Sequence, residues 1–249
     1  MKILVAVKRV IDPYVRIKVK ADESGVETNN IKMSMNPFDE IALEEAIRLR
    51  EKNIASEVII VTIANNANQD VLRHGLALGA DRAILIQTVD SYCSLNIAKI
   101  LKKVVIDEKI DLVLMGKQAI DSDNNQTPQM LAGILDWPQA TYASKITISD
   151  NKVTVQRETD AGIEEIATEL PAVLSVDLRL NEPRYASLPN IMKAKQKPLT
   201  IVQLDSLGLN LQKHMQVLKT LTPTPRASGI KVDSVKTLID KLHEESRVI

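Results

Sequence analysis

The sequence predicts an α/β fold built on a doubly wound, mostly parallel sheet. Short aliphatic runs suited to buried strands recur along the chain, segments with helical periodicity separate them, and several runs end in polar loops. Strands that alternate with helices at this spacing form a parallel sheet, and right-handed crossovers place the helices on both of its faces. An antiparallel strand addition and an extended C-terminal arm complete the predicted architecture.

The first half of the chain supplies most of the parallel sheet. The apolar run at 3–7 predicts a buried strand, and alternating apolar and basic residues at 15–19 predict a short extra strand. Further buried strands are expected at 57–63, 83–86 and 112–115, with helices at 37–52, 70–78 and 94–107. Asn36 is a favoured N-cap with Pro37 in the first helical position, and Gly79 is expected to end the second helix in a left-handed conformation.

A polar loop, residues 116–127, follows the strand at 112–115 and leads into a short helix predicted over 128–135. Open α/β sheets bind ligands beyond the carboxyl ends of their strands, where a helix start offers unpaired N–H groups to a phosphate. Gly116 would allow a close backbone approach, and the amides and hydroxyls after it can hydrogen-bond a base or ribose. The competing interpretation is a surface loop whose Asn and Asp residues only cap the helix.

The second half of the chain changes pattern. Strands with short connections are expected at 141–149, 152–157 and 163–168, which indicates antiparallel hairpins added to the sheet edge or covering it, before a buried strand at 171–176. The proline-rich stretch after it is long enough to be functional, and Leu188, Ile191 and Met192 could form an apolar anchor with a basic rim. The alternative is a loop packed on its own body. A final helix is expected at 234–243, in a segment that either crosses another subunit or folds back.

The composition argues against several classes of protein. Of the 249 residues 45% are apolar and 26% are charged, as in ordinary soluble proteins. Lys plus Arg and Asp plus Glu balance at 32 each, so no overall field attracts nucleic acid or a membrane, and no apolar run is long enough to insert into one. Cys93 is the single cysteine, and the three histidines have no ligand spacing, so no metal site is expected. The N-terminus lacks a signal-peptide pattern, which favours the bacterial cytoplasm, or the mitochondrial matrix for a mature eukaryotic form.

Several motifs of catalytic or nucleotide-binding proteins are missing from the sequence. It contains neither the glycine pattern of dinucleotide-binding folds nor a P-loop, and it has no nucleophile elbow and no paired-histidine zinc motif. Asp121 and Asp123 could serve acid–base chemistry or hold a metal, but a solvated, hydrogen-bonding role fits them better, since no second charged cluster accompanies them. The residues therefore predict a nucleotide-binding protein and no catalytic residues.

Six segments, in this order and spacing, give the chain a resemblance to a known family: Val5–Val10, Ser34–Phe38, Gly116–Asp121, Asn125–Thr127, Asp136–Gln139 and Leu178–Ala186. The chain resembles the beta subunits of electron-transfer flavoproteins along nearly its whole length. The resemblance implies an adenine-nucleotide alpha-hydrolase-like fold and a heterodimer with an alpha subunit. In that family the alpha subunit holds most of the redox FAD, and the beta subunit buries an AMP without a redox role. The complex takes electrons from acyl-CoA and related dehydrogenases and passes them to an electron-transfer flavoprotein–quinone oxidoreductase.

The resemblance also implies site residues. It assigns the AMP contacts to Ala6, Asn36, Pro37, Phe38, Asp39, Ile63, Gly116, Lys117, Gln118, Ala119, Ile120, Asp121, Ser122, Asp123, Asn124, Asn125, Gln126 and Thr127. It assigns contacts with partner proteins to Arg184, Tyr185, Leu188, Pro189, Ile191 and Met192, with Leu188 as the anchor that enters a dehydrogenase. Lys193 and Lys195 match lysines that are modified in some members.

The expected organisation is a nucleotide-binding domain over 1–198, including a docking loop at 176–198, and a C-terminal arm over 199–249 that crosses to the partner subunit. Two residues depart from some relatives. Pro13, beside Tyr14, replaces a tyrosine near the flavin, and Asp39 replaces a small neutral residue, so we expect only its backbone to face the nucleotide. The alternatives are a bifurcating beta subunit with a second FAD in place of AMP, a nucleotide-hydrolysing or adenylating enzyme, and a non-catalytic nucleotide sensor.

Overall fold

The computed structural model describes all 249 residues, except for the side chain of Ala67. The chain forms two compact units, which are described separately. The first comprises residues 1–16 and 28–217, and the second comprises residues 17–27 and 218–249.

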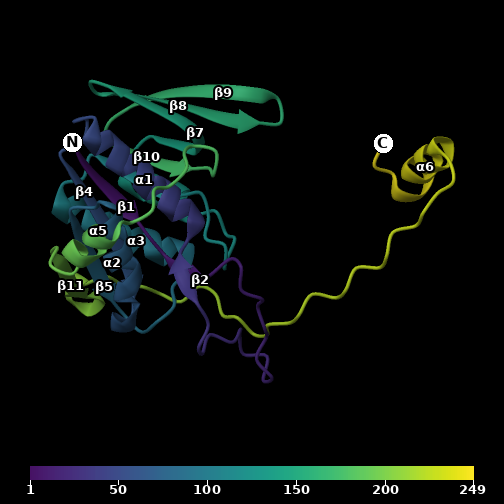
Figure 1. Cartoon of the computed structure of the whole chain (residues 1–249), viewed down its shortest axis with the longest axis horizontal. Coiled ribbons are helices and arrows are strands. Elements are labelled where there is room, and N and C mark those ends of the chain that lie inside the picture. Colours follow the sequence, from purple (N-terminus) through teal and green to yellow (C-terminus); the bar gives the residue numbers. More distant parts are fainter. The chain divides into compact units, whose positions relative to one another are not determined.

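The first unit is organised around one nine-stranded sheet with the strand order β11-β5-β4-β1-β6-β10-β7-β8-β9 (Figure 1). Its parallel part runs from the edge strand β11 (Leu199–Gln203) through β5 (Arg82–Gln87), β4 (Glu57–Ala64), β1 (Lys2–Ala6) and β6 (Leu112–Gly116) to β10 (Ala172–Val176). A separate two-stranded antiparallel ribbon pairs β2 (Arg9–Ile11) with β3 (Met33–Met35). The predicted doubly wound, mostly parallel sheet is confirmed.

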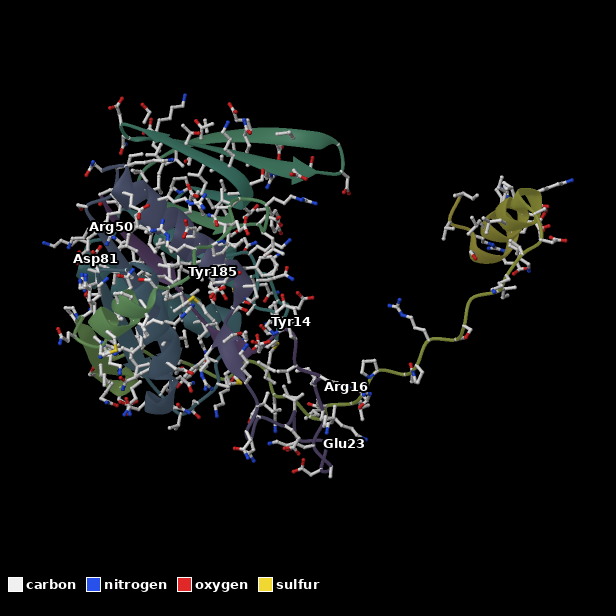
Figure 2. All side chains as sticks on the ribbon, viewed as in Figure 1. Tyr14, Arg16, Glu23, Arg50, Asp81 and Tyr185 are labelled. Carbon is white, nitrogen blue, oxygen red and sulfur yellow. The ribbon has the colours of Figure 1, made fainter. Side chains whose placement is uncertain are left out.

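Helices cover both faces of this sheet, as expected. They are α1 (Pro37–Glu51), α2 (Gln69–Leu78), α3 (Ser94–Glu108), α4 (Thr127–Leu135) and α5 (Leu188–Ala194), with 3-10 turns at Asn66–Asn68 and Leu204–Leu207. Successive side chains of a strand point to opposite faces, so Ile3 and Val5 of β1 pack with α1 and α2, whereas Leu4 packs with α3 and α4. An ion pair between Arg50 at the end of α1 and Asp81 before β5 joins the α1–α2 layer to the sheet (Figure 2).

The end of α2 explains one glycine. Gly79 follows the helix with φ 146°, a conformation that L side chains rarely adopt. A Cβ on this residue would also lie 3.2 Å from the Ile47 side chain of α1. The expected glycine at the helix end is therefore present, but its φ lies well beyond that of a regular left-handed residue.

The antiparallel strands extend the sheet beyond its parallel part, as predicted. β7 (Gln139–Ser149) pairs in parallel with β10 over its first residues and then antiparallel with β8 (Lys152–Thr159), which pairs with β9 (Gly162–Glu169). The ladder shifts register on both sides of β7 near Ala143. These irregularities let one strand belong to two kinds of ladder, because a bulge bends and twists the strand.

The first unit continues beyond the boundary expected at residue 199. The segment expected to start the C-terminal arm forms β11, which pairs in parallel with β5 at the sheet edge, and Leu204 after it is buried. Leu209 and Leu211 pack on the same core cluster. Residues 199–203 belong to the first unit because β5 offers an open edge with which this short stretch can pair. The first unit ends at Val217.

The second unit has little regular structure. The expected strand at 15–19 does not form: in the described chain, this region contributes a single antiparallel bridge between Val19 and Val26. Its alternating residues have no neighbouring strand long enough to pair with. Lys219 Nζ contacts Glu23 at 2.7 Å, and the Thr220 N–H donates to the Glu23 carbonyl at 2.9 Å. The expected final helix is α6 (Val235–Lys241), which continues as a π-helical turn over Leu242–Ser246.

Candidate functional site

The candidate site lies where the strand order reverses. From β1 the chain proceeds to β4 and β5 on one side and then returns to β6 on the other, so β1 and β6 flank the switch point of the sheet. Ala6, the last residue of β1, is opposite Val61 of β4 and Met115 of β6. Ile63, one residue before the end of β4, and Gly116, the last residue of β6, lie at this same edge. Ligands of open α/β sheets bind in this position.

Asn36 connects the start of α1 to the 116–127 loop. Asn36 occupies the N-cap position of α1 with Pro37 in the first turn, as expected, but its side chain makes no cap bond to that helix within the described chain. Its fully buried amide instead donates from Nδ2 to the Gln118 carbonyl at 2.9 Å and accepts from the Ile120 N–H at 3.1 Å. A primary amide can donate to a carbonyl and accept from an N–H at the same time. Asn36 therefore binds the loop backbone through both kinds of hydrogen bond, as an adjacent β-strand would.

Asp39 joins the ends of β1 and β6. Its carboxylate accepts the Lys8 N–H at 2.8 Å and the Gly116 N–H at 3.2 Å. Burial raises the pKa of Asp39 to about 7, although these hydrogen bonds and one from Asn36 favour the charged form. The carboxylate is therefore committed to the protein backbone, and only the main chain of Asp39 is left to face a ligand.

Gly116 allows a close approach, but the approaching group belongs to the protein itself. A Cβ at this position would lie 2.6 Å from Phe38 Cβ and 2.8 Å from the Phe38 carbonyl carbon, and it would also collide with the Asp39 carboxylate. The glycine therefore lets the first turn of α1 pack directly over the end of β6. That packing brings the residues around Asn36 against the 116–127 loop.

The charged side chains of the loop are paired within the protein. Lys8 Nζ contacts Asp121 at 2.7 Å, and Asp123 accepts from the Gln118 amide. Lys117 Nζ contacts Asp177 at 2.7 Å and lies 5.2 Å from the centre of the Phe38 ring. Asp121 and Asp123 thus serve separate contacts, and within the described residues no group of three His, Cys, Asp or Glu side chains is arranged to hold a metal ion.

The last residues of the loop turn the chain into α4. Asp123 and Asn125 adopt left-handed backbone conformations, with φ of 51° and 50°, which Asp and Asn tolerate better than most residues. Gln126 precedes the helix, and its carbonyl accepts the Met130 N–H at 3.0 Å. The first turn of α4 is uncharged. Its free N–H groups and the largely exposed polar side chains before it, from Ser122 to Thr127, remain available to a ligand.

This arrangement fits an adenine nucleotide. Two helix starts, α1 and α4, meet at the switch point, and each presents N–H groups with a partial positive charge suited to a phosphate. The carboxylates that could repel an anion are bonded to Lys8, to Gln118 or to backbone N–H groups. The exposed amides and hydroxyls of the loop can serve the ribose and the base.

The 176–198 segment contains a helix that the sequence analysis treated as a loop. α5 begins after Ser187, whose Oγ accepts the Asn190 N–H at 3.4 Å, and its last carbonyl, that of Ala194, accepts Arg73 Nη1 at 2.8 Å. The helix packs against α2. Three prolines and only one buried residue, Ala194, hid the helical pattern in the sequence.

α5 leaves apolar side chains exposed. Leu188 is 73% exposed, Met192 56% and Ile191 43%, so the three residues predicted as an anchor form one apolar face one turn long. Tyr185, just before the helix, is 97% exposed (Figure 2) and Pro189 is exposed as well. Singly these exposures are ordinary, but on α5 the three apolar side chains are neighbours on one helix face.

Arg184 has a different environment from its neighbours. Its guanidinium contacts Glu44 at 2.8 Å and Glu51 at 2.6 Å, both on α1. Burial disfavours the charged form of Glu44, but hydrogen bonds from Arg184 and Arg48 hold its pKa below the usual value. Arg184 thus fastens the 176–198 segment to α1, and Asn181 reinforces it by donating to the Ile41 carbonyl at 3.1 Å.

Sequence reasoning missed several residues that shape the site. Lys8 contributes its N–H to Asp39 and its ammonium to Asp121, and Asp177 pairs with Lys117. Tyr142 accepts a hydrogen bond from Asn125 at 2.8 Å. These partners lie far apart in sequence, so no local spacing could have identified them. Tyr14, the neighbour of the Pro13 that stands where some relatives carry a tyrosine near the flavin, is 95% exposed.

Comparison with known proteins identifies similar chains. The model of the electron transfer flavoprotein domain family matches residues 24–207. The chain is 53% identical to the mitochondrial electron transfer flavoprotein subunit beta of Arabidopsis thaliana, with both chains fully covered. It is 51% identical to the electron transfer flavoprotein subunit beta of Bradyrhizobium diazoefficiens, again over both full lengths. It is 49% identical to that of Homo sapiens, over all of this chain and 99% of the relative. The relatives thus include bacterial and mitochondrial proteins, and no helix among the described residues is long and apolar enough to span a membrane.

Proposed function

The chain belongs to the electron transfer flavoprotein family as a beta subunit, and from this premise we propose that it is of the AMP-binding, non-bifurcating type. In this role it is an electron carrier subunit and not an enzyme. AMP is a structural ligand at the carboxyl edge of the sheet, and the FAD lies at the interface, held mainly by an alpha subunit. The C-terminal segment, from residue 218 onward, reaches that subunit.

One observation carries the proposal of AMP binding. The 116–127 loop is held at the switch point by a buried amide, Asn36, while its outer polar groups stay exposed between two helix starts. A loop that only capped α4 would not need the two hydrogen bonds from Asn36 at the start of α1. The nucleotide contacts would come from the main chain of residues 36–39 and 116–127 and from the exposed side chains of Ser122, Asn124 and Gln126.

The exposed face of α5 supports the second part of the function. We propose that Leu188, Ile191 and Met192 dock acyl-CoA and related dehydrogenases, with Tyr185 and Pro189 at the rim. Arg184 is part of this surface through the conformation it imposes on the segment. The electrons then leave towards a quinone oxidoreductase. A soluble location, bacterial cytoplasm or mitochondrial matrix, goes with this role.

Cofactor content tests the proposal. The chain is co-purified with its alpha partner, the complex is denatured, and the released adenine nucleotides are quantified by chromatography. We expect one FAD and one AMP per heterodimer. Two FAD and no AMP would identify a bifurcating protein, and FAD without any second nucleotide would mean that the 116–127 loop is only a helix cap.

A further inference from the structure

Asn125 is held by contacts that a helix cap does not require. It occupies the left-handed region, φ 50°, two residues before α4. Its Nδ2 donates to the Tyr142 hydroxyl at 2.8 Å, and its Oδ1 accepts from the Gln129 amide at 3.2 Å. The side chain therefore bridges β7 and the first turn of α4, and its position fixes where the polar end of the loop lies.

Tyr142 has an unusual backbone of its own. Its φ is 61°, rare for a bulky residue, and it lies where β7 changes from a parallel to an antiparallel neighbour. Its N–H donates to Oγ of Ser175 at 3.2 Å, and Ser175 is fully buried in β10. This bond helps to stabilise the positive-φ backbone of Tyr142, and in that conformation the tyrosine hydroxyl reaches Asn125.

We propose that Tyr142 is a positioning residue of the nucleotide site: by holding Asn125, it ties the 116–127 loop to the bulge between the parallel and antiparallel parts of the sheet. The proposal rests on AMP binding as proposed above. Tyr142 contacts the loop through Asn125, so its hydroxyl acts on the nucleotide through the position in which it holds the loop. Two hydrogen bonds, from Gln129 to Asn125 and from Asn125 to Tyr142, connect the start of α4 and the loop to β7.

The test removes the hydroxyl and nothing else. Tyr142→Phe keeps the ring and the backbone, and Tyr92→Phe is the matched control, because the Tyr92 hydroxyl donates to Asp90 in its own loop, at 3.5 Å, and takes no part in this bond chain. The holo-heterodimers are mixed with excess labelled AMP, and the exchange rate of bound AMP is measured. One hydrogen bond corresponds to a change of about 3–10-fold, so Tyr142→Phe should exchange AMP faster by about this factor and Tyr92→Phe should match the wild type.

A second variant separates positioning from general destabilisation. Asn125→Ala removes the same bond from the other side, so the double variant with Tyr142→Phe should exchange AMP no faster than Asn125→Ala alone. Additive effects, or unchanged exchange in Tyr142→Phe, would overturn the inference. A wild-type complex that holds no AMP would instead overturn the proposed function, so the two failures are distinguishable.

Discussion

The 116–127 loop and the 176–198 segment are both long connections after buried strands, yet they are built in opposite ways. The first half of the loop is bound from the protein side: Asn36 and Asp39 bind its backbone and Lys8 pairs with Asp121, while the polar side chains that follow stay largely exposed. The 176–198 segment is fastened at Arg184 and at both ends of α5, and it directs apolar side chains outward.

The difference teaches how one chain separates the proposed ligand site from the proposed docking surface. A ligand site needs polar groups whose positions are fixed before binding, because ordering them on binding would cost affinity. A docking surface needs exposed apolar area on a stable support, because burying that area in the partner provides the binding free energy. Substitutions in the loop should therefore change stability and nucleotide content together, whereas substitutions on the α5 face should change only partner reactions.

The largest effect is expected at Gly116. Gly116→Ala forces a Cβ against Phe38 and Asp39, and we expect it to lower the free energy of unfolding by about 2–3 kcal/mol and to reduce the bound AMP. Gly133→Ala in α4 is the matched control, since its Cβ would face open space in the described structure, and it should raise stability by about 0.5–1 kcal/mol. Urea unfolding of both variants, with nucleotide quantification, tests this. Equal stabilities would show that α1 does not lock the loop.

The next effect concerns the fastening of the docking segment. Arg184→Gln leaves Glu44, whose side chain is 3% exposed, with Arg48 as its remaining cation, so we expect a loss of about 2 kcal/mol in unfolding free energy. Arg179→Gln is the control, because Arg179 is 63% exposed and pairs with the exposed Glu158. Thermal unfolding measures both variants. If Arg184→Gln kept its stability and lost only partner reduction, Arg184 would be a direct docking residue.

The sequence predicted the fold well because the signals were local. Short aliphatic runs such as 57–63 and 112–115, bounded by polar residues, favour buried strands, and both strands formed. The short turns between the strands after 141 predicted the antiparallel addition correctly. The strand expected at 15–19 failed because its alternation lacks a partner strand. β11 was missed because its burial pattern is that of a half-exposed edge strand.

The candidate site was only partly predictable. Its position followed from the strand–loop–helix pattern and from the resemblance, but the roles of its residues did not. Asn36 looks like a cap in the sequence and in the structure holds a loop more than 80 positions away. The Asp39 carboxylate accepts the N–H of Gly116, which lies 77 residues further along the chain. Such pairs become visible only when the sheet brings their strands together.

A smaller effect, confined to partner reactions, is expected on the α5 face. Leu188→Ala should lower the kcat/KM for reduction of the bound FAD by a dehydrogenase about tenfold, because a buried leucine contributes roughly 1.5–3 kcal/mol. Leu188 is 73% exposed, so stability and cofactor content should not change. Val89→Ala, at a more exposed apolar residue in the loop before α3, should leave the reaction unaffected. Loss of flavin in Leu188→Ala would instead mean that this face is structural and that the contrast with the loop is invalid.

The smallest effect is a pH dependence that belongs to the loop side of the comparison. Burial raises the pKa of Asp39 to about 7, so the native state holds this proton more tightly than the unfolded chain does. The stability that Asp39 contributes is therefore complete below its unfolded pKa, near 4, and is lost as the pH rises through about 7. Asp39→Asn cannot titrate, so between pH 5 and 7 the wild type should lose stability relative to this variant by on the order of 1 kcal/mol per pH unit. Urea unfolding of both proteins at several pH values measures the difference, and parallel pH profiles would mean that the hydrogen bonds from Lys8 and Gly116 keep Asp39 ionised throughout.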